Sequence, residues 1–176
     1  MPRPARIDLR LFQQELATRL ASKTTAQVES SRLGLNCAGE RWLLRLADAA
    51  EVVAVPPLAA VPLTQPWFLG LANIRGNLYS VVDLARFLGR AAAVPHGGGG
   101  QSRIILFGSR AADMNVGVVV QGVLGLRNIA ELAPAPSVTD APAWYGQRWT
   151  DPDGGTWQEF DLARLAADPV FLRVGL

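Results

Sequence analysis

The chain has 176 residues, of which 49% are hydrophobic and 18% charged, and its formal net charge is +2. This composition allows a sizeable core in one compact domain or two small lobes, and it argues against general disorder. The basic residues are scattered among acidic ones, with Lys23 the only lysine, so no basic stripe of the kind that follows phosphates is present.

The first thirty residues are predicted to form a helical extension and a linker. Apolar residues spaced four or five apart, with charged residues between them, predict an amphipathic helix over 7–21. The polar stretch SKTTAQVESS follows as a linker. The chain shows neither a signal-peptide core nor an apolar segment long enough to span a bilayer, so we expect a cytoplasmic protein without membrane insertion.

Strands are predicted from Arg32 onward. Residues 32–46 contain two short extended runs joined at Ala38-Gly39-Glu40, which predicts a hairpin. Residues 49–58 continue the β pattern until Pro56-Pro57, because proline cannot sit inside a central strand. Residues 68–84 form a longer apolar β run, with bulges or sharp bends expected at its glycines, Gly70 and Gly76.

Two aspartates are predicted to cap short helices. Asp83 precedes LARFLG, which Gly89 can end in the left-handed conformation, and Asp161 precedes LARLAAD. Each aspartate opens a DLAR tetrapeptide that follows an apolar strand. The repetition indicates one β unit used twice.

The glycine-rich stretch over 95–102 is predicted to be a flexible loop. It lacks the Lys-Ser/Thr pair and the following helix that a phosphate-binding P-loop requires. Residues 103–126 then predict a strand, a polar turn through Arg110 to Asp113, and a second strand running into Val123. Together the segments predict a mainly β fold of two small barrels packed along an apolar seam.

Residues suited to catalysis or metal binding are scarce. His96 is the only histidine and lies beside the glycine tract, and Cys37, the only cysteine, sits in an apolar alternation typical of a buried, inert thiol. Asp151 and Asp153 lie in TDPDGG, which has turn composition. We therefore expect no catalytic residue, no metal site and no cofactor.

Arg75 stands beside a glycine in an otherwise apolar β run. A buried and unpaired guanidinium would cost several kcal/mol, on the order of 3–5, so the side chain either reaches solvent at an edge or meets an acid inside the fold. Glu51, 24 positions earlier, is the nearest upstream acid in a β context. The pattern leaves a solvent-facing Arg75 and a Glu51–Arg75 pair open.

The segment APAWYGQRW places three aromatic residues among Pro and Gly near the C-terminus. Such a segment is either an exposed interface patch or an anchor of the core, and core packing is the favoured interpretation.

The stretch GLANIRGNLYSVVDL resembles the signature of the CheW-like family. PWFLGLANIRG is similar to the approach that precedes this signature, and VGVVVQGVLGL resembles a strand of the family's second lobe. The hairpin over 32–46 and the Glu51–Arg75 spacing also fit. The resemblance covers about 32–167, within domain limits predicted as 31–170 with a tail over 171–176.

The resemblance implies two SH3-like five-stranded barrel lobes and a non-enzymatic adaptor. CheW-like proteins link the cytoplasmic tips of methyl-accepting chemoreceptors to the regulatory domain of a CheA-type histidine kinase. The family carries an acid–arginine couple at the positions of Glu51 and Arg75. We therefore expect a partner-binding groove, and the residues assigned to it are Glu51, Val53, Asn73, Ile74, Arg75, Gly76 and Val81.

The N-terminal extension and the Trp-rich C-terminal segment are most similar to the PilI type of the family, which serves type IV pili and twitching motility. Gln121 departs from the family, which often has an acid there. The alternatives are a flagellar chemotaxis coupling protein, a generic small-barrel binding module, or an enzyme with an unrecognised site.

Overall fold

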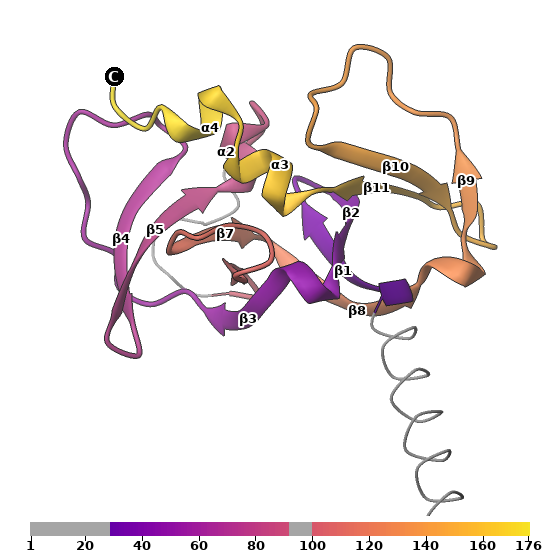
Figure 1. Cartoon of the computed structure of the whole chain (residues 1–176), viewed down its shortest axis with the longest axis horizontal. Coiled ribbons are helices and arrows are strands. Elements are labelled where there is room, and N and C mark those ends of the chain that lie inside the picture. The colour runs from indigo at the N-terminus through magenta and orange to yellow at the C-terminus, as the bar shows by residue number, and fades with distance from the viewer. Residues whose placement is uncertain (1–28, 92–99) are drawn as a thin grey trace, which may run out of the picture.

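The computed structural model describes residues 29–91 and 100–176. The helix predicted over 7–21, most of the linker after it and most of the glycine-rich loop lie outside the described residues. Within them, β-strands dominate and divide into two sheets, each of which curls into a small lobe (Figure 1).

The first lobe, residues 49–120, is a five-stranded sheet in the order β3-β6-β7-β5-β4. Its strands are β3 (Ala49–Ala54), β4 (Phe68–Ile74), β5 (Asn77–Asp83), β6 (Arg103–Phe107) and β7 (Val116–Val120). All neighbours are antiparallel except β5 and β7. The chain after β3 returns along the outer edge of β4, where Ala59 and Leu71 exchange two backbone hydrogen bonds of 2.8 and 2.9 Å. This contact covers the free edge of β4.

The second lobe is a six-stranded sheet in the order β8-β1-β2-β11-β10-β9, in which only β2 and β11 are parallel. Its strands are β1 (Ser31–Cys37), β2 (Glu40–Arg45), β8 (Gly122–Asn128), β9 (Ala133–Ala135), β10 (Tyr145–Thr150) and β11 (Thr156–Phe160). The sheet curls, since its two outermost strands are separated in the chain only by the 3-10 helix η2 (Ile129–Glu131) and Leu132. The three-residue β9 makes this lobe one strand larger than the five expected.

The first lobe is inserted into the second. The chain leaves the second lobe after β2 through the 3-10 helix η1 (Leu46–Asp48) and returns through Gln121. The segment predicted as one strand ending at Val123 is therefore two strands in different sheets, because β7 ends at Val120. In this respect the sequence-based prediction was wrong. The predicted hairpin is confirmed, with Ala38 and Gly39 at positive φ in a two-residue turn.

The two DLAR segments occupy equivalent places. Each follows a hairpin, β4–β5 or β10–β11, and opens a short helix, α2 (Leu84–Phe87) or α3 (Leu162–Ala166). Asp83 Oδ1 accepts a hydrogen bond from Arg86 N at 3.2 Å, and Asp161 Oδ1 accepts one from Arg164 N at 3.1 Å. Both predicted N-caps are confirmed.

The likeness extends to the segment before each hairpin. Arg86 Nη1 donates to Pro66 O and Arg164 Nη1 donates to Ala143 O, each at 3.1 Å. The next residue in each case is a buried tryptophan, whose carbonyl accepts from the backbone N–H of the capping aspartate at 2.8 or 2.9 Å. These matching bonds support the interpretation that one β unit is used twice.

Aromatic side chains join the lobes. Phe87 of α2 contacts Trp144 of the second lobe, with ring centroids 5.9 Å apart, and Trp67 of its own lobe at 5.2 Å. Phe171, on the short helix α4 (Pro169–Leu172), stacks on Trp67 at 6.1 Å. The buried residues of both lobes form one cluster, and α2, α3 and α4 lie along one side of it (Figure 1). Phe171 thus belongs to the core, although it begins the segment expected to be a tail.

Candidate functional site

Arg75 lies at the tip of the β4–β5 hairpin and not inside a strand. The strands pair up to Ile74 and Asn77, which leaves Arg75 and Gly76 as a two-residue turn with φ of +52° and +85°. Positive φ at both positions is the geometry of a type I′ turn. The Asn73 side chain reinforces it, since its Oδ1 accepts from Gly76 N at 2.9 Å. The sharp bend expected at Gly76 is confirmed, and the placement of Arg75 within a strand is corrected.

Arg75 and Glu51 form an ion pair, with Arg75 Nη2 donating to Glu51 Oε1 at 2.6 Å. Glu51 lies on β3 and the turn follows β4, the two outermost strands of the five-stranded sheet. The pair therefore connects opposite edges of the curled sheet. The side chains are 76% and 34% exposed, so Arg75 both reaches solvent and pairs with Glu51, and each of the alternatives that the sequence left open holds in part.

The other residues assigned to the groove divide by burial. Asn73 and Gly76 are exposed beside Arg75, and Val53 is half-buried against the core. Ile74 and Val81 are buried, and Val81 has no exposed surface, so these two side chains line no surface of this structure.

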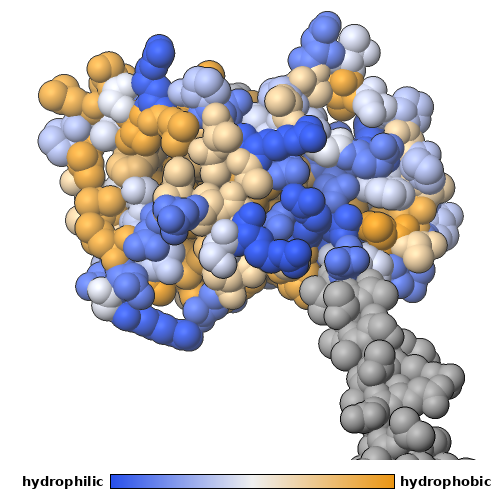
Figure 2. All heavy atoms as spheres, in the orientation of Figure 1, coloured by the Kyte–Doolittle hydropathy of each residue, from blue (hydrophilic) through white to orange (hydrophobic). Residues whose placement is uncertain are grey.

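Exposed apolar residues accompany the ion pair. Val52 follows Glu51 on β3, and Leu78 lies three positions after Arg75 on β5. Figure 2 shows hydrophobic residues gathered along the left margin of the first lobe, whereas hydrophilic residues cover the region between the lobes. The Glu51–Arg75 pair thus belongs to the lobe with an apolar margin, and large exposed apolar patches mark sites of interaction with other molecules.

Other acidic and nucleophilic groups have structural roles. Asp151 Oδ2 accepts from Trp157 Nε1 at 3.0 Å, and Asp151 Oδ1 accepts from Gly155 N at 2.6 Å. The Trp157 hydrogen bond is the main cause of the lowered pKa of Asp151. The predicted turn role is thereby confirmed. Among the described residues, which do not include His96, no group of three or more His, Cys, Asp or Glu could hold a metal ion.

Cys37 is buried in β1, as the sequence predicts. Desolvation raises the pKa of its thiol to about 12, and the charges of Asp83 and Glu40 act in the same direction. The group is a protonated thiol at neutral pH, unsuited to nucleophilic chemistry.

Gln121 joins the two lobes through an uncharged contact. Its side-chain Oε1 accepts from Gly39 N, in the β1–β2 turn, at 3.2 Å, and its backbone N donates to Asn36 O at 2.9 Å. An amide oxygen can make the side-chain contact without a negative charge.

A buried ion pair, which the sequence did not reveal, lies in the second lobe. Arg32 Nε donates to Glu159 Oε1 at 2.6 Å, with the two side chains 9% and 13% exposed. Trp149 Nε1 donates to the second carboxylate oxygen of Glu159 at 3.3 Å. The partners are 127 positions apart, and no local pattern marks either of them.

A sequence profile of the CheW-like domain matches residues 32–170, which include both lobes. The chain belongs to the CheW-like family. Within this family it is similar to protein PilI of Pseudomonas aeruginosa, with 28% identity over 114 residues covering 62% of this chain and 61% of that protein. It is also 36% identical to protein FrzA of Myxococcus xanthus over 100 residues, 54% of this chain and 58% of FrzA. The match thus spans about three fifths of the length of each relative.

The CheW-like fold is also seen in a solved structure. The crystal structure of the scaffolding protein TtCheW from Thermoanaerobacter tengcongensis superposes with a TM-score of 0.62. The match has 24% identity and covers 75% of this chain and 88% of TtCheW. None of the described helices has the length and apolarity needed to cross a membrane.

Proposed function

We propose that this chain is a non-enzymatic adaptor that couples methyl-accepting chemoreceptors to a CheA-type histidine kinase in bacterial chemosensory signalling. The CheW-like family match over both lobes is the observation that carries the proposal. The roles of Asp151 and Cys37, one in a turn and one in the core, agree with an adaptor that catalyses nothing.

The receptor surface is the side of the first lobe that carries the Glu51–Arg75 pair. There the half-buried Glu51 and the exposed Asn73 and Arg75 meet the receptor's helical tip, while Ile74 and Val81 support the strands from beneath. The ion pair holds the β4–β5 turn against β3 and so keeps the shape of this surface fixed.

The kinase regulatory domain binds at a barrel end, so that one adaptor contacts receptor and kinase together. Each contact is modest, with a dissociation constant of about 1 μM, or roughly −8 kcal/mol. The adaptor works in the cytoplasm beneath receptor arrays, where many weak contacts act together and raise the effective affinity. The similarity to PilI supports a role in the control of type IV pilus twitching motility.

A two-armed pull-down tests the proposal. The chain is offered separately to a receptor's cytoplasmic tip and to a CheA-type regulatory domain, and we expect it to retain both. Arg75→Glu places two acids side by side, so it should lose the receptor and keep the kinase domain. Arg173→Glu is the matched control, because Arg173 is an exposed arginine that follows α4, at the end of the first lobe away from the β4–β5 turn (Figure 1).

If the wild-type chain failed to retain the receptor tip, the kinase domain or both, the adaptor proposal would be refuted. Equal receptor binding by wild type and Arg75→Glu would show that the receptor does not bind at this turn. It would not contradict the adaptor function. A thermal-shift screen with nucleotides and metal ions tests the enzymatic alternative, since a clear upward shift would contradict a chain without cofactors.

A further inference from the structure

Exposed apolar side chains gather at one end of the first lobe. They are between 36% and 82% exposed, and they make up five of the eleven large hydrophobic residues exposed in the described part of the chain. We call them the α4 patch, and they are Val61, Leu63, Val170, Leu172 and Leu176. Figure 2 shows hydrophobic residues at the upper left of the first lobe, the corner where Figure 1 places the C-terminus.

Backbone hydrogen bonds fix the segments that carry the α4 patch. Leu176 N donates to Leu63 O at 3.1 Å, and Gln65 N donates to Val174 O at 2.8 Å. The segment after α4 therefore runs beside the loop that precedes β4. Val174 packs against the core, and the buried Phe171 anchors α4. The patch is thus a surface with a defined shape.

Leu63 is held in a strained conformation. Its φ is +58°, in the left-handed region that glycine and asparagine adopt more readily than leucine. Its side chain is 79% exposed, so packing within this chain does little to offset the strain. Strained backbone of this kind is concentrated where proteins contact other molecules. The conformation of Leu63 therefore indicates that its side chain has a binding role.

The α4 patch has one acid and one base at opposite ends of α4. Asp168 Oδ1 accepts from Val170 N at 2.7 Å and from Phe171 N at 3.2 Å, which leaves Oδ2 for a further donor. Arg173 follows the helix, is exposed and forms no ion pair within residues 29–91 and 100–176. Two copies of α4 packed antiparallel would bring each Arg173 towards the Asp168 of the other copy. The patch is therefore complementary in charge to itself.

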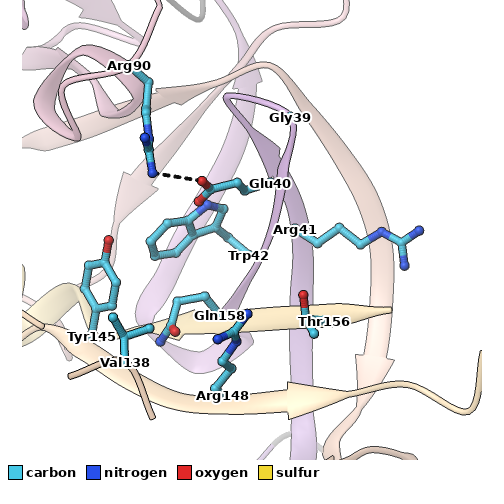
Figure 3. A pocket seen from close by; sticks show the side chains of 10 residues that line it. All are labelled: Gly39, Glu40, Arg41, Trp42, Arg90, Val138, Tyr145, Arg148, Thr156 and Gln158. Carbon is cyan, nitrogen blue, oxygen red and sulfur yellow. Dashed lines mark hydrogen bonds and ion pairs between the residues drawn. The ribbon is translucent and has the colours of Figure 1, made fainter. Parts of the chain in front are cut away.

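The second lobe presents a different kind of surface. Its hollow beside β2, β10 and β11 is lined mainly by polar and charged side chains, and Arg90 donates to Glu40 there at 3.1 Å (Figure 3). Such a surface is already well solvated and gains little from contact with apolar groups. The apolar end of the first lobe is the stronger candidate for a protein interface.

We propose that the α4 patch joins two copies of this chain in a two-fold symmetric dimer. Its five apolar residues expose roughly 400 Å², a patch size that is often functional. A standard interface takes about 800 Å² from each partner, and the polar rim with Asp168 and Arg173 supplies the remainder. A hollow of about 280 Å³ beside Val170, lined also by Trp67 and Pro169, receives an apolar side chain of the second copy.

The dimer leaves the proposed receptor surfaces free. The α4 patch lies at the end of the first lobe away from the β4–β5 turn (Figure 1), so the Glu51–Arg75 pair of each copy stays accessible. One dimer then presents two receptor surfaces, which raises the effective affinity for receptors in an array. This consequence rests on the proposed function, whereas the dimer itself does not.

Sedimentation velocity of the full chain over a concentration series tests the proposal, and we expect one monomer–dimer equilibrium. Leu63→Asn removes the apolar side chain and supplies a residue suited to positive φ. It should weaken the dimer about tenfold or more, while the free energy of unfolding, measured at high dilution, stays the same or rises. Leu126→Asn is the matched control, because Leu126 is an exposed leucine on β8 of the second lobe, and it should leave the dimer unchanged.

A double-mutant cycle tests the charges across the interface. Arg173→Glu sets two acids against each other and should weaken the dimer about tenfold or more. Asp168→Asn removes the charge but keeps the cap, because asparagine caps helices as well as aspartate does. In the Asp168→Asn background Arg173→Glu should weaken the dimer much less, since the facing acid is gone.

A chain that stays monomeric at concentrations on the order of 100 μM would overturn the proposal and leave the α4 patch to a different protein. So would an open-ended series of larger assemblies, which a contact between two different surfaces produces. Unchanged dimerisation in Leu63→Asn, or additive effects in the cycle, would also overturn it. Sedimentation involves neither receptor nor kinase, so its failure would leave the adaptor function untouched.

Discussion

Each lobe holds an ion pair of the same length, yet the two pairs lie in opposite surroundings. Arg75–Glu51 in the first lobe and Arg32–Glu159 in the second both measure 2.6 Å between nitrogen and oxygen. The Arg75–Glu51 pair is at a turn and is exposed to solvent, whereas the Arg32–Glu159 pair is largely buried and its carboxylate accepts a hydrogen bond from Trp149 Nε1. The distance between two charges therefore says little about how much the pair contributes to the free energy of unfolding. That contribution depends on how far each charge is removed from water when the chain folds.

The largest expected effect follows from breaking the buried pair. Glu159→Gln keeps the shape of the side chain but leaves the buried Arg32 guanidinium without its counter-charge, so we expect a loss of about 3–5 kcal/mol in the free energy of unfolding. Urea denaturation followed by tryptophan fluorescence measures it. A loss below about 1 kcal/mol would mean that the Arg32–Glu159 pair contributes no more to stability than the exposed pair, which would contradict the difference between the lobes.

A smaller effect is expected from the two capping aspartates, which allow the lobes to be compared at matched positions. Asp83→Ala removes a fully buried cap, and Asp161→Ala removes a partly exposed one that also accepts from Arg45 Nη2 at 3.1 Å. We expect losses of about 2 and about 1 kcal/mol, within the usual range for N-caps. The same denaturation experiment ranks them, and a reversed order would show that the Arg45 contact outweighs burial.

Arg75→Ala should cost less than about 1 kcal/mol, because both partners remain accessible to water. Its receptor affinity, by contrast, should fall. A variant with intact stability and lost receptor binding would separate recognition from folding at this turn, whereas a loss as large as that of Glu159→Gln would mean that the turn closes the barrel.

The smallest effect on stability is expected from Cys37, because its thiol does not ionise at neutral pH. Its folded-state pKa, about 12, lies above its usual value near 9.0, so its contribution to stability is present below pH 9 and is lost as the pH rises toward 12. At pH 8 the thiol of the folded chain should resist a disulfide reagent. Glu159→Gln should speed the labelling of Cys37, because both residues lie in the second lobe, and Arg75→Ala should not. Equal labelling rates in the two variants would show that the effect of Glu159→Gln is not confined to the second lobe.

Local patterns were sufficient to predict the hairpin at Ala38-Gly39, both aspartate caps and the bend at Gly76, whereas only the family resemblance favoured the paired state of Glu51 and Arg75. Each depends on residues close in sequence or on the family resemblance. Arg75 was placed wrongly because an apolar run on both sides of Arg-Gly fits one bent strand as well as two strands joined by a tight turn. The pair Arg32–Glu159 depends on strands far apart in the sequence, and only the parallel pairing of β2 with β11 brings them together.

The insertion of one lobe within the other gives the chain an order of completion during synthesis. Strands β3 to β7 leave the ribosome as one continuous segment and can pair while translation proceeds. The β1–β2 hairpin emerges earlier, but β2 can pair with β11 only after the chain has been made as far as Phe160. A nascent chain stopped before Thr156 would expose the bare edge of β2 to other chains, so a strand that is translated later protects one that is translated earlier.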